Sequence, residues 1–475
     1  MQKNTFHDIL SRFFHSFMLD LKGNTSMNAV IIFCALSLLL IVGKLLRVAI
    51  PVFQKLYLPS SVIGGLVGLV IFSCFGDHIP SELIGGIKKL PGFLINVVFA
   101  ALFLGAAIPR VKEVFKIAFP QICLGQILAW GQYVIGLTLA YFIFAPCFKL
   151  PHAFGNLLEI GFQGGHGTVG GMTEVFTTFK WEDGVALGFT VATCGMIVGI
   201  VAGMALVNWA HKKGYVKSVK TFDERQKFEQ QGIYPSENRP SAGLQTVFCD
   251  SIDSLAFHIA LIGLSILLGF TILKLLQYGE VSLLPTAKTR IFSGFPLFPL
   301  CMIGGVLLQC LLSKVKLDSL VNKEQMQRLS GASLDFLVVS AVATIQLKVV
   351  MDNLLPLLIL VVSGTVFCIA TVIFVAPRLL KNAWFEKAIA DFGQATGVTA
   401  TGLMLLRTVD PENKTEAAAT FGYKQLIHEP FMGGGLWTAL ALTLVFTIGL
   451  IPVLLISIVM LIIWCIIAAV IMKRK

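Results

Sequence analysis

The sequence predicts an all-α polytopic membrane protein made of two inverted five-helix repeats, each with a re-entrant loop, and one extra C-terminal transmembrane helix. Three observations support this fold class: the apolar composition, a pair of glycine-rich interruptions at corresponding places, and the distribution of basic residues. Hydrophobic residues make up 56% of the chain and charged residues only 13%. A typical soluble domain carries about 25% charged residues, so we expect most of this chain to lie within lipid.

Hydropathy divides the chain into five parts. Apolar residues recur at helical spacing near the start, at Phe6, Ile9, Leu10, Phe13, Phe14, Phe17 and Leu21. Residues 1–26 are therefore predicted to form an amphipathic helix, either in the membrane interface or on the flank of the protein, and not a cleavable signal peptide. The other parts are a first repeat (27–210), a hydrophilic linker (211–246), a second repeat (247–450) and the extra helix (451–475).

Apolar runs of about 20 residues mark the expected membrane spans. In the first repeat they fall near 27–46, 58–75, 92–109, 117–146 and 183–209. In the rest of the chain they fall near 252–276, 291–312, 333–347, 354–377, 426–450 and 452–472. The second span of each repeat contains the pattern P-x-x-x-I-G-G, at Pro59–Gly65 and Pro299–Gly305. This match indicates an internal repeat.

The first interruption is GFQGGHGTVGGMTEVF, from Gly161 to Phe176, which lies between the fourth and fifth spans. Six of the eleven residues from Gly161 to Gly171 are glycine. Each would weaken a helix interior by about 1 kcal/mol relative to alanine, so we expect broken backbone at membrane depth. Such backbone persists only where protein or a water-filled path satisfies its polar groups, as at a substrate or ion site. Close helix packing through small residues is the alternative explanation.

A second interruption, ADFGQATGVTATG at Ala390–Gly402, has the corresponding place in the second repeat. Because an odd number of spans inverts one repeat relative to the other, the two stretches are expected to enter from opposite faces and meet near the midplane. Glycine amides and half-helix N-termini suit a carboxylate, and carbonyl and threonine oxygens suit sodium. The candidate substrate-binding residues are Gly164, Gly165, His166, Gly167, Thr168, Gln394, Thr396, Gly397, Thr399 and Thr401.

The candidate ion-binding residues are Asp391, Gly393 and Glu429. Asp391 heads the second stretch, and Glu429 precedes a run of three glycines at 433–435. An unpaired charge inside a membrane costs several kcal/mol, so each carboxylate marks either an ion site or a solvated position at the interface. His166 either hydrogen-bonds a substrate carboxylate or is a structural histidine.

Basic residues predict the orientation in the membrane. Most of the 37 Lys and Arg residues fall on the same side as the linker if the N-terminus is outside. The positive-inside rule then places the central linker and the C-terminus in the cytoplasm. The expected location is the cytoplasmic or inner cell membrane, with lipid as a partner.

The residues Gln163–Thr168 read QGGHGT, which resembles the GGHGT re-entrant loop of the bacterial sodium/glutamate symporter family, within the wider group of carriers with GGxG-type loops. The order of spans and interruptions is also similar, over most of residues 27–450. The resemblance implies sodium as the coupling ion, glutamate as the substrate, a homodimer, and an elevator-type movement of the part that carries both loops.

The second loop departs from that family's pattern. The family has a G-F-G-x-G run and Thr-Pro-Thr, where this chain has Gly393-Gln394-Ala395-Thr396-Gly397 and Thr399-Ala400-Thr401. Asp391 has no acidic counterpart in familiar members. Because this loop would determine specificity, a sodium-coupled carrier of another organic anion, such as a di- or tricarboxylate, is the alternative function.

Other function classes have less support. The sequence contains no HExxH, GxGD or aspartate-rich diphosphate motif, so we do not expect an enzyme. The net charge of +11 lies mostly in short gaps between apolar runs, so we expect no nucleic-acid partner. The ten cysteines are dispersed singly, and no organic cofactor is expected. A channel is a further alternative, but two opposed loops in one chain favour alternating access.

Overall fold

The computed structural model describes residues 25–76, 79–106, 111–216, 226–283, 292, 295–411 and 414–473. Within these ranges the secondary structure is helical, with no β-strand. Seven of the described helices are long and apolar enough to cross a membrane. The predicted amphipathic segment at residues 1–26 lies outside the described residues except for its last two, which open the first helix.

The first part of the chain ends in one long helix that runs beside several short ones. Its elements are α2 (Thr25–Ala49), α3 (Pro51–Lys55), α4 (Ser60–Phe75), α5 (Ser81–Ala101), α6 (Val111–Leu139), a π-helical turn (Ala140–Phe144), α7 (Ala145–Phe148), α8 (Leu157–Phe162), α9 (Gly165–Gly171), α10 (Thr173–Thr178) and α11 (Asp183–Lys212). The short helices α8, α9 and α10 occupy the first glycine-rich stretch.

The second part is also a series of long and short helices. Its elements are α12 (Lys227–Gln231) in the linker, then α13 (Ser254–Leu283), α14 (Phe298–Lys314), α15 (Lys323–Ala343), α16 (Leu347–Asp352), α17 (Leu354–Ala370), a π-helical turn (Thr371–Val375), α18 (Ala376–Leu379), α19 (Trp384–Val409), α20 (Ala417–His428), α21 (Leu436–Thr447) and α22 (Leu450–Lys473).

One body, which we call the scaffold, consists of α2, α4, α5, α13, α14 and α15. The two P-x-x-x-I-G-G motifs explain its close packing. Gly64 in α4 lies against the Leu39 carbonyl of α2, and Gly304 in α14 lies against the Ser265 carbonyl of α13. The next glycine of each motif packs on the third long helix of the other half, α15 or α5. Small residues therefore interlock the two halves of the chain.

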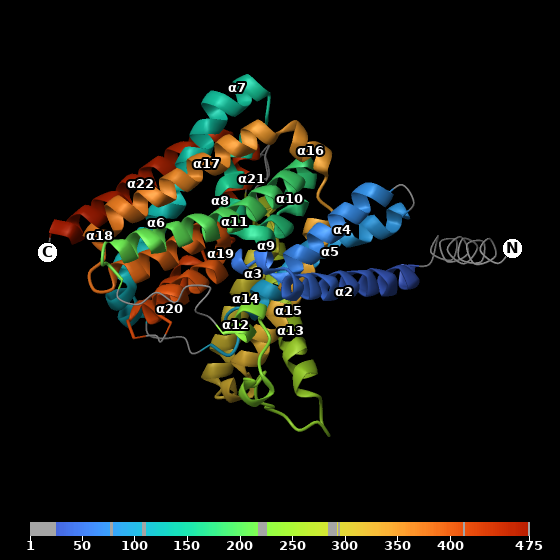
Figure 1. Ribbon diagram of the computed structural model, residues 1–475. Helices are drawn as coiled ribbons and strands as arrows, with labels where there is room; N and C mark the ends of the chain where they lie inside the picture. The colour runs from blue at the N-terminus through green and yellow to red at the C-terminus, as the bar shows by residue number, and fades with distance from the viewer. Residues whose placement is uncertain are drawn as a thin grey trace.

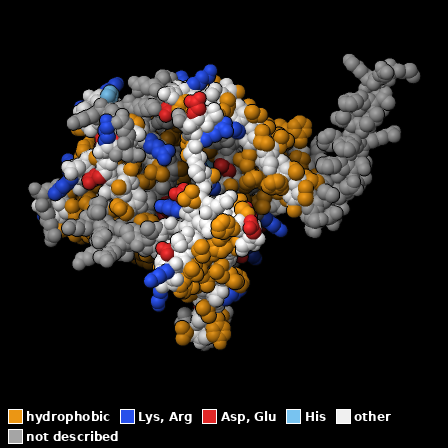
Figure 2. Space-filling model, turned by 90° about the horizontal axis from the view of Figure 1, so that it is seen from below, with side chains coloured by type: hydrophobic (Ala, Val, Ile, Leu, Met, Phe, Trp, Pro, Cys, Tyr) orange, Lys and Arg blue, Asp and Glu red, His pale blue; other side chains and the backbone are white. Residues whose placement is uncertain are grey.

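The other body, which we call the core body, consists of α6, α8 to α11, α17 and α19 to α22. In Figure 1 its helices α6, α17 and α22 lie on the side of the C-terminus, and α2, α4 and α5 project toward the N-terminus. Seen from below, hydrophobic side chains cover much of the projecting part, with Lys and Arg between and around them (Figure 2). This apolar surface suits contact with lipid.

The extra C-terminal helix packs along α6. The Cys123 thiol in α6 donates a hydrogen bond to the Trp464 carbonyl oxygen of α22 at 3.4 Å, and the rings of Phe119 and Trp464 lie 6.4 Å apart. Side chains along the opposite side of α22, such as Leu455 and Ile466, are more than half exposed. The helix is thus attached to the core body by one face.

The prediction of a single span at 426–450 is wrong. α20 ends at His428 and α21 begins at Leu436, and φ is +68° at Gly433 and +109° at Gly434. Three consecutive glycines after Pro430 allow this unwound connection, because only glycine readily adopts such angles. The predicted spans at 92–109 and 333–347 begin too late, since α5 and α15 extend toward their polar N-terminal ends.

Candidate functional site

The first glycine-rich stretch contains a sharp break between α8 and α9. Gly165 begins α9 with φ of +65°, and the Thr168 hydroxyl donates to the Gly164 carbonyl at 3.0 Å. Leu157 in α8 and Val169 in α9 both approach Gly188 of α11, with side-chain atoms 3.6 and 2.8 Å from a Cβ built there. The chain therefore reverses direction at the break.

The second glycine-rich stretch breaks within α19. The backbone is non-helical at Gly397 (φ −147°, ψ 37°) and at Val398 (φ 62°, ψ 172°). A positive φ is unfavourable for a β-branched residue, so Val398 is held there by its surroundings. A Cβ at Gly393 would lie 2.7 Å from the Cα of Gly402, so the segments before and after the break lie side by side.

The two breaks meet each other. A Cβ on Gly165 would overlap the Val398 side chain, which places the tip of the first stretch against the tip of the second. Next to this contact, the Gln394 amide Nε2 donates to Gln163 Oε1 at 3.3 Å. Both glutamines are almost completely buried. The candidate residues Gly164, Gly165, Gln394 and Gly397 therefore gather at one place.

A third unwound segment, residues 429–435, reaches the same place from between α20 and α21. A Cβ at Gly434 would overlap the Thr168 hydroxyl, and one at Gly433 would lie 3.4 Å from both the Gln163 carbonyl oxygen and Gln394 Nε2. The run of glycines was a signal for this segment, but the apolar residues around it suggested an uninterrupted span.

A chain of hydrogen bonds leads from Trp130 to Gln163. The Trp130 indole, which can only donate, bonds Gln126 Oε1 at 2.9 Å. Gln126 must then use its Nε2 to donate to His428 Nδ1 at 3.2 Å. His428 consequently carries its proton on Nε2, which donates to Gln163 Oε1 at 3.0 Å. The donor-only indole therefore fixes the orientation of every group in this chain.

The orientation is also fixed from the opposite end. The Lys424 ammonium, another pure donor, bonds Gln394 Oε1 at 3.1 Å, so Gln394 presents its Nε2 to Gln163. Gln163 Oε1 thus accepts from both sides, and Gln163 Nε2 has no partner among the described residues. Burying a hydrogen-bond donor without an acceptor costs free energy, which favours a ligand with acceptor oxygens at this point.

Glu429 joins the second break. Its Oε1 accepts hydrogen bonds from the Thr399 hydroxyl at 2.5 Å and from Gln425 Nε2 at 2.9 Å. Gln425 Nε2 also lies 2.5 Å from the Thr399 oxygen. The sequence placed Glu429 and Thr399 among the candidates, and the structure brings these two residues together.

Asp391 is paired with a lysine. Its Oδ1 lies 3.4 Å from Lys424 Nζ, and both side chains are 0% exposed. Gln121 Nε2 donates to the same oxygen at 3.4 Å. Lys424 was not predicted as a site residue, because a lone lysine just before an expected span is typical of the membrane interface.

Glu159 is a fully buried carboxylate that the sequence did not select. Its Oε2 accepts from the Tyr133 hydroxyl at 2.6 Å. Its Oε1 accepts from the Gly433 amide at 2.8 Å and from the Thr438 hydroxyl at 3.0 Å. No basic side chain in the described ranges lies within ion-pair distance of Glu159. The carboxylate therefore joins α6, α8, α21 and the third unwound segment through hydrogen bonds alone.

Other candidates face away from the paired glutamines. The Thr193 hydroxyl donates to the Phe189 carbonyl, so it accepts from His166 Nε2 at 2.9 Å. His166 is therefore held on α11 by Thr193 and stacks on the Phe189 ring. Thr396 and Thr401 also face α11 beside Gly199, and Gly167 faces Ile95 of the scaffold.

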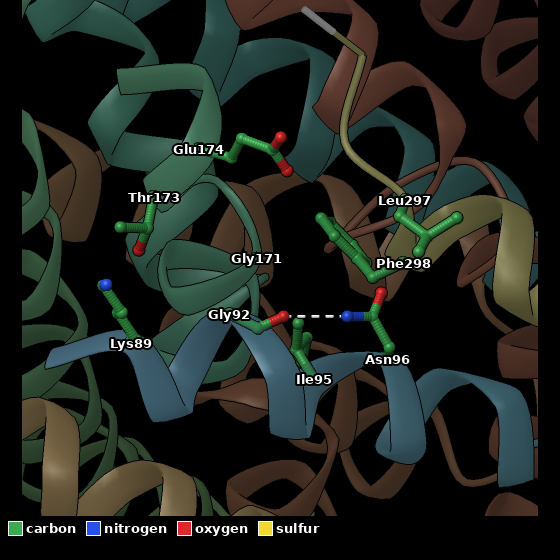
Figure 3. Close-up of a pocket in the computed structure, with 9 residues that line it drawn as sticks. All are labelled: Lys89, Gly92, Ile95, Asn96, Gly171, Thr173, Glu174, Leu297 and Phe298. Carbon is green, nitrogen blue, oxygen red and sulfur yellow. Dashed lines mark hydrogen bonds between the residues drawn. The ribbon is translucent and has the colours of Figure 1, made fainter. Parts of the chain in front are cut away.

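A cavity of about 200 Å³ lies between α5 of the scaffold and α9 and α10 of the core body. Figure 3 shows Lys89 and Asn96 from α5 and Thr173 and Glu174 from α10 around its open centre, with Phe298 closing one end. The cavity thus has polar and charged side chains beside α9 and α10. The sequence predicted no pocket at this place.

The comparison with protein families matches residues 25–411, most of the chain, to the sodium/glutamate symporter. The chain belongs to the sodium/glutamate symporter family. This symporter is accordingly a multi-pass membrane transporter. The family match ends before α20, so Lys424, Glu429 and the third unwound segment lie beyond it. A search of curated proteins gave no match.

Proposed function

We propose that this protein is a sodium-coupled symporter that takes up glutamate or a related small carboxylate. The observation that carries the proposal is the meeting of two broken helices at Gln163 and Gln394, where Gln163 Nε2 is buried without an acceptor. A substrate carboxylate supplies acceptor oxygens for such a donor. Membership of the sodium/glutamate symporter family supports both the ion and the substrate class.

Two features support inverted repeats. Each half has a π-helical turn followed directly by Ala-Pro, at Ala145 and at Ala376. The same number of residues then leads to Gln163 in one half and to Gln394 in the other. The reciprocal packing of the two P-x-x-x-I-G-G motifs is the second feature. A repeat with an odd number of spans places its copy upside down, so the two hairpins enter as re-entrant loops from opposite faces.

Uncompensated carboxylates support coupling to a cation. Asp391 is offset by Lys424, but Glu159 and Glu429 have no basic partner within ion-pair distance in the described ranges. An anionic substrate adds negative charge beside them. Sodium ions that bind with the substrate would offset this charge, and carboxylate and threonine oxygens are suitable ligands.

The division into two bodies supports an elevator-type mechanism. Both breaks belong to the core body, and the cavity with Lys89 and Glu174 lies at its boundary with the scaffold. In this proposal the core body moves against a scaffold that forms a homodimer. The orientation expected from the basic residues, with the N-terminus outside and the linker in the cytoplasm, belongs to the same proposal.

Uptake into proteoliposomes tests this function. An inward sodium gradient is expected to drive accumulation of labelled glutamate, and potassium is expected not to replace sodium. Preloaded unlabelled glutamate should give counterflow, which a channel does not. Competition with aspartate and with di- and tricarboxylates decides between glutamate and another organic anion. Uptake that is indifferent to sodium would overturn the proposal.

Gln163→Glu tests the substrate role of the unpaired amide. The change keeps Oε1 for His428 and Gln394 but replaces the free donor with a negatively charged acceptor. Repulsion of a substrate carboxylate is expected to raise the KM for uptake by tenfold or more, which corresponds to about 1.4 kcal/mol. The matched control is Gln346→Glu on the exposed surface, which is expected to leave KM unchanged. An unchanged KM in Gln163→Glu would remove this amide from the substrate site.

A further inference from the structure

The Lys424 ammonium is enclosed by oxygen atoms. Its Nζ lies 2.8 Å from Gln425 Oε1, 3.1 Å from Gln394 Oε1 and 3.4 Å from Asp391 Oδ1. The lysine and aspartate side chains are 0% exposed. Carboxylate and amide oxygens around one positive charge are also the ligands that a small hard cation prefers.

The space for this ammonium is provided by a glycine in α6. A Cβ at Gly125 would overlap Lys424 Cε and lie 3.0 Å from Nζ. The position is therefore formed by three helices: α6 supplies the room, α19 supplies Asp391 and Gln394, and α20 supplies Lys424 and Gln425. The ammonium is held at a specific place in the core body and is not directed to solvent.

This place adjoins the second break. Gln394 lies three residues before the break at Gly397, and Gln425 also contacts Thr399 just after it. The ammonium thus contacts one of the paired glutamines directly and is linked to the Glu429 carboxylate through Gln425.

Among the described residues, no second basic side chain lies within ion-pair distance of Asp391. Lys387, one turn earlier in α19, pairs with Glu416 at 2.6 Å. His428 has both ring nitrogens in hydrogen bonds with glutamines. α6 presents Gln121 and Gln126 to this region, and Asp391 Oδ2 has no hydrogen-bond partner in the described part of the chain. Within the described ranges, the charge of Asp391 is therefore offset by Lys424 alone.

We propose that Lys424 is a tethered cation that permanently occupies a monovalent-cation site formed by Asp391, Gln394 and Gln425. Asp391, which the sequence suggested as a sodium ligand, then serves the lysine in the native protein. Sodium then binds elsewhere, and the carrier binds one sodium ion fewer than it would bind if the lysine were absent. The inference rests on the proposed cation coupling, and it adds a residue that sets the number of ions.

Removal of the ammonium should open the site to sodium. Lys424→Met replaces the side chain with an unbranched, uncharged one that lacks the terminal ammonium, which leaves the buried Asp391 carboxylate without a counterion. The measurement is thermal unfolding of the purified full-length protein across a sodium series, with choline replacing sodium at constant ionic strength. A ligand that binds only the folded state raises its stability, and an added site is expected to steepen the rise of stability with the logarithm of sodium concentration by up to one further bound ion.

Two further variants isolate the cause. The double variant Asp391→Asn with Lys424→Met has no charge at the site and is expected to return to the wild-type sodium dependence. Lys387→Met removes the lysine one turn before Asp391 in α19, whose partner Glu416 is about half exposed, and it is expected to leave sodium dependence unchanged. If Lys424→Met is recovered folded only when sodium is present during purification, that result also supports the site.

Several results would overturn the inference. One is a folded Lys424→Met protein with the wild-type sodium dependence. Another is an equal gain in sodium dependence in the double variant. A third is a Lys424→Met protein that choline restores to the folded state as well as sodium does, or that neither salt restores. None of these measurements uses a substrate. Absence of sodium-driven glutamate uptake by the wild type would therefore overturn the proposed function. The added sodium dependence of Lys424→Met is tested independently of that result.

Discussion

Replacing Gly165 with valine is expected to abolish transport while the protein still inserts into the membrane. Gly165 has φ of +65°, which costs a non-glycine residue about 1–2 kcal/mol and a β-branched residue more. Any side chain at this position also overlaps Val398 at the tip of the second stretch. The two tips must then separate, which disrupts the arrangement of Gln163 and Gln394. The measurement is sodium-driven uptake, normalised to the amount of protein in the vesicles.

Gly422→Val is the matched control for that variant. Gly422 lies in α20 near the same region, but no atom is within 4 Å of a Cβ added there. It is expected to retain uptake within about twofold, since an exposed helix position tolerates such a change at well under 1 kcal/mol. Wild-type uptake by Gly165→Val would show that the contact between the tips is not needed for transport.

Glu159→Ala is expected to give the largest loss of stability among single substitutions at the site. It leaves the Tyr133 hydroxyl, the Gly433 amide and the Thr438 hydroxyl without their acceptor. Each buried unsatisfied donor costs about 1–3 kcal/mol, so a loss of about 3 kcal/mol or more is expected. The third unwound segment loses its attachment to α8 as well. The measurement is the Tm of the purified protein, together with uptake.

Two comparisons make the Glu159 prediction specific. Glu159→Gln keeps one acceptor oxygen and the shape of the side chain, so its Tm is expected to lie between those of the wild type and Glu159→Ala. Glu174→Ala removes an exposed carboxylate from the same stretch and is expected to leave Tm unchanged. A Tm for Glu159→Ala equal to that of Glu174→Ala would mean that the three hydrogen bonds do not hold the segment in place.

The two broken stretches were predictable because their signal is local. Glycine weakens helices in any context, and the runs at Gly161–Gly171 and Ala390–Gly402 contain too many small and β-branched residues for continuous packing helices. The two P-x-x-x-I-G-G motifs could also be recognised from the sequence alone, because they too are local. Their contacts with the opposite half of the chain could not be read from the sequence, because they depend on how the two halves pack.

The buried polar network was not predictable. Whether Lys424 is interfacial or enclosed depends on the absence of a side chain at Gly125, which is remote in the sequence. The role of Glu159 depends on amide and hydroxyl donors from residues after 430. Glu429 was a candidate ion-binding residue because it is a carboxylate near apolar sequence. Its partner Thr399 was a candidate for a different reason, as part of the second stretch. Each of these contacts joins residues that are distant in the sequence and depends on the tertiary structure.

The attachment of α22 to α6 has a mechanical consequence. In the proposed elevator-type mechanism, a helix fixed along the side of the core body and apolar on its outer side travels with that body through the surrounding acyl chains. The work of displacing and reordering those chains then becomes part of each turnover, so turnover should slow in stiff or poorly matched bilayers and quicken in fluid ones of suitable thickness.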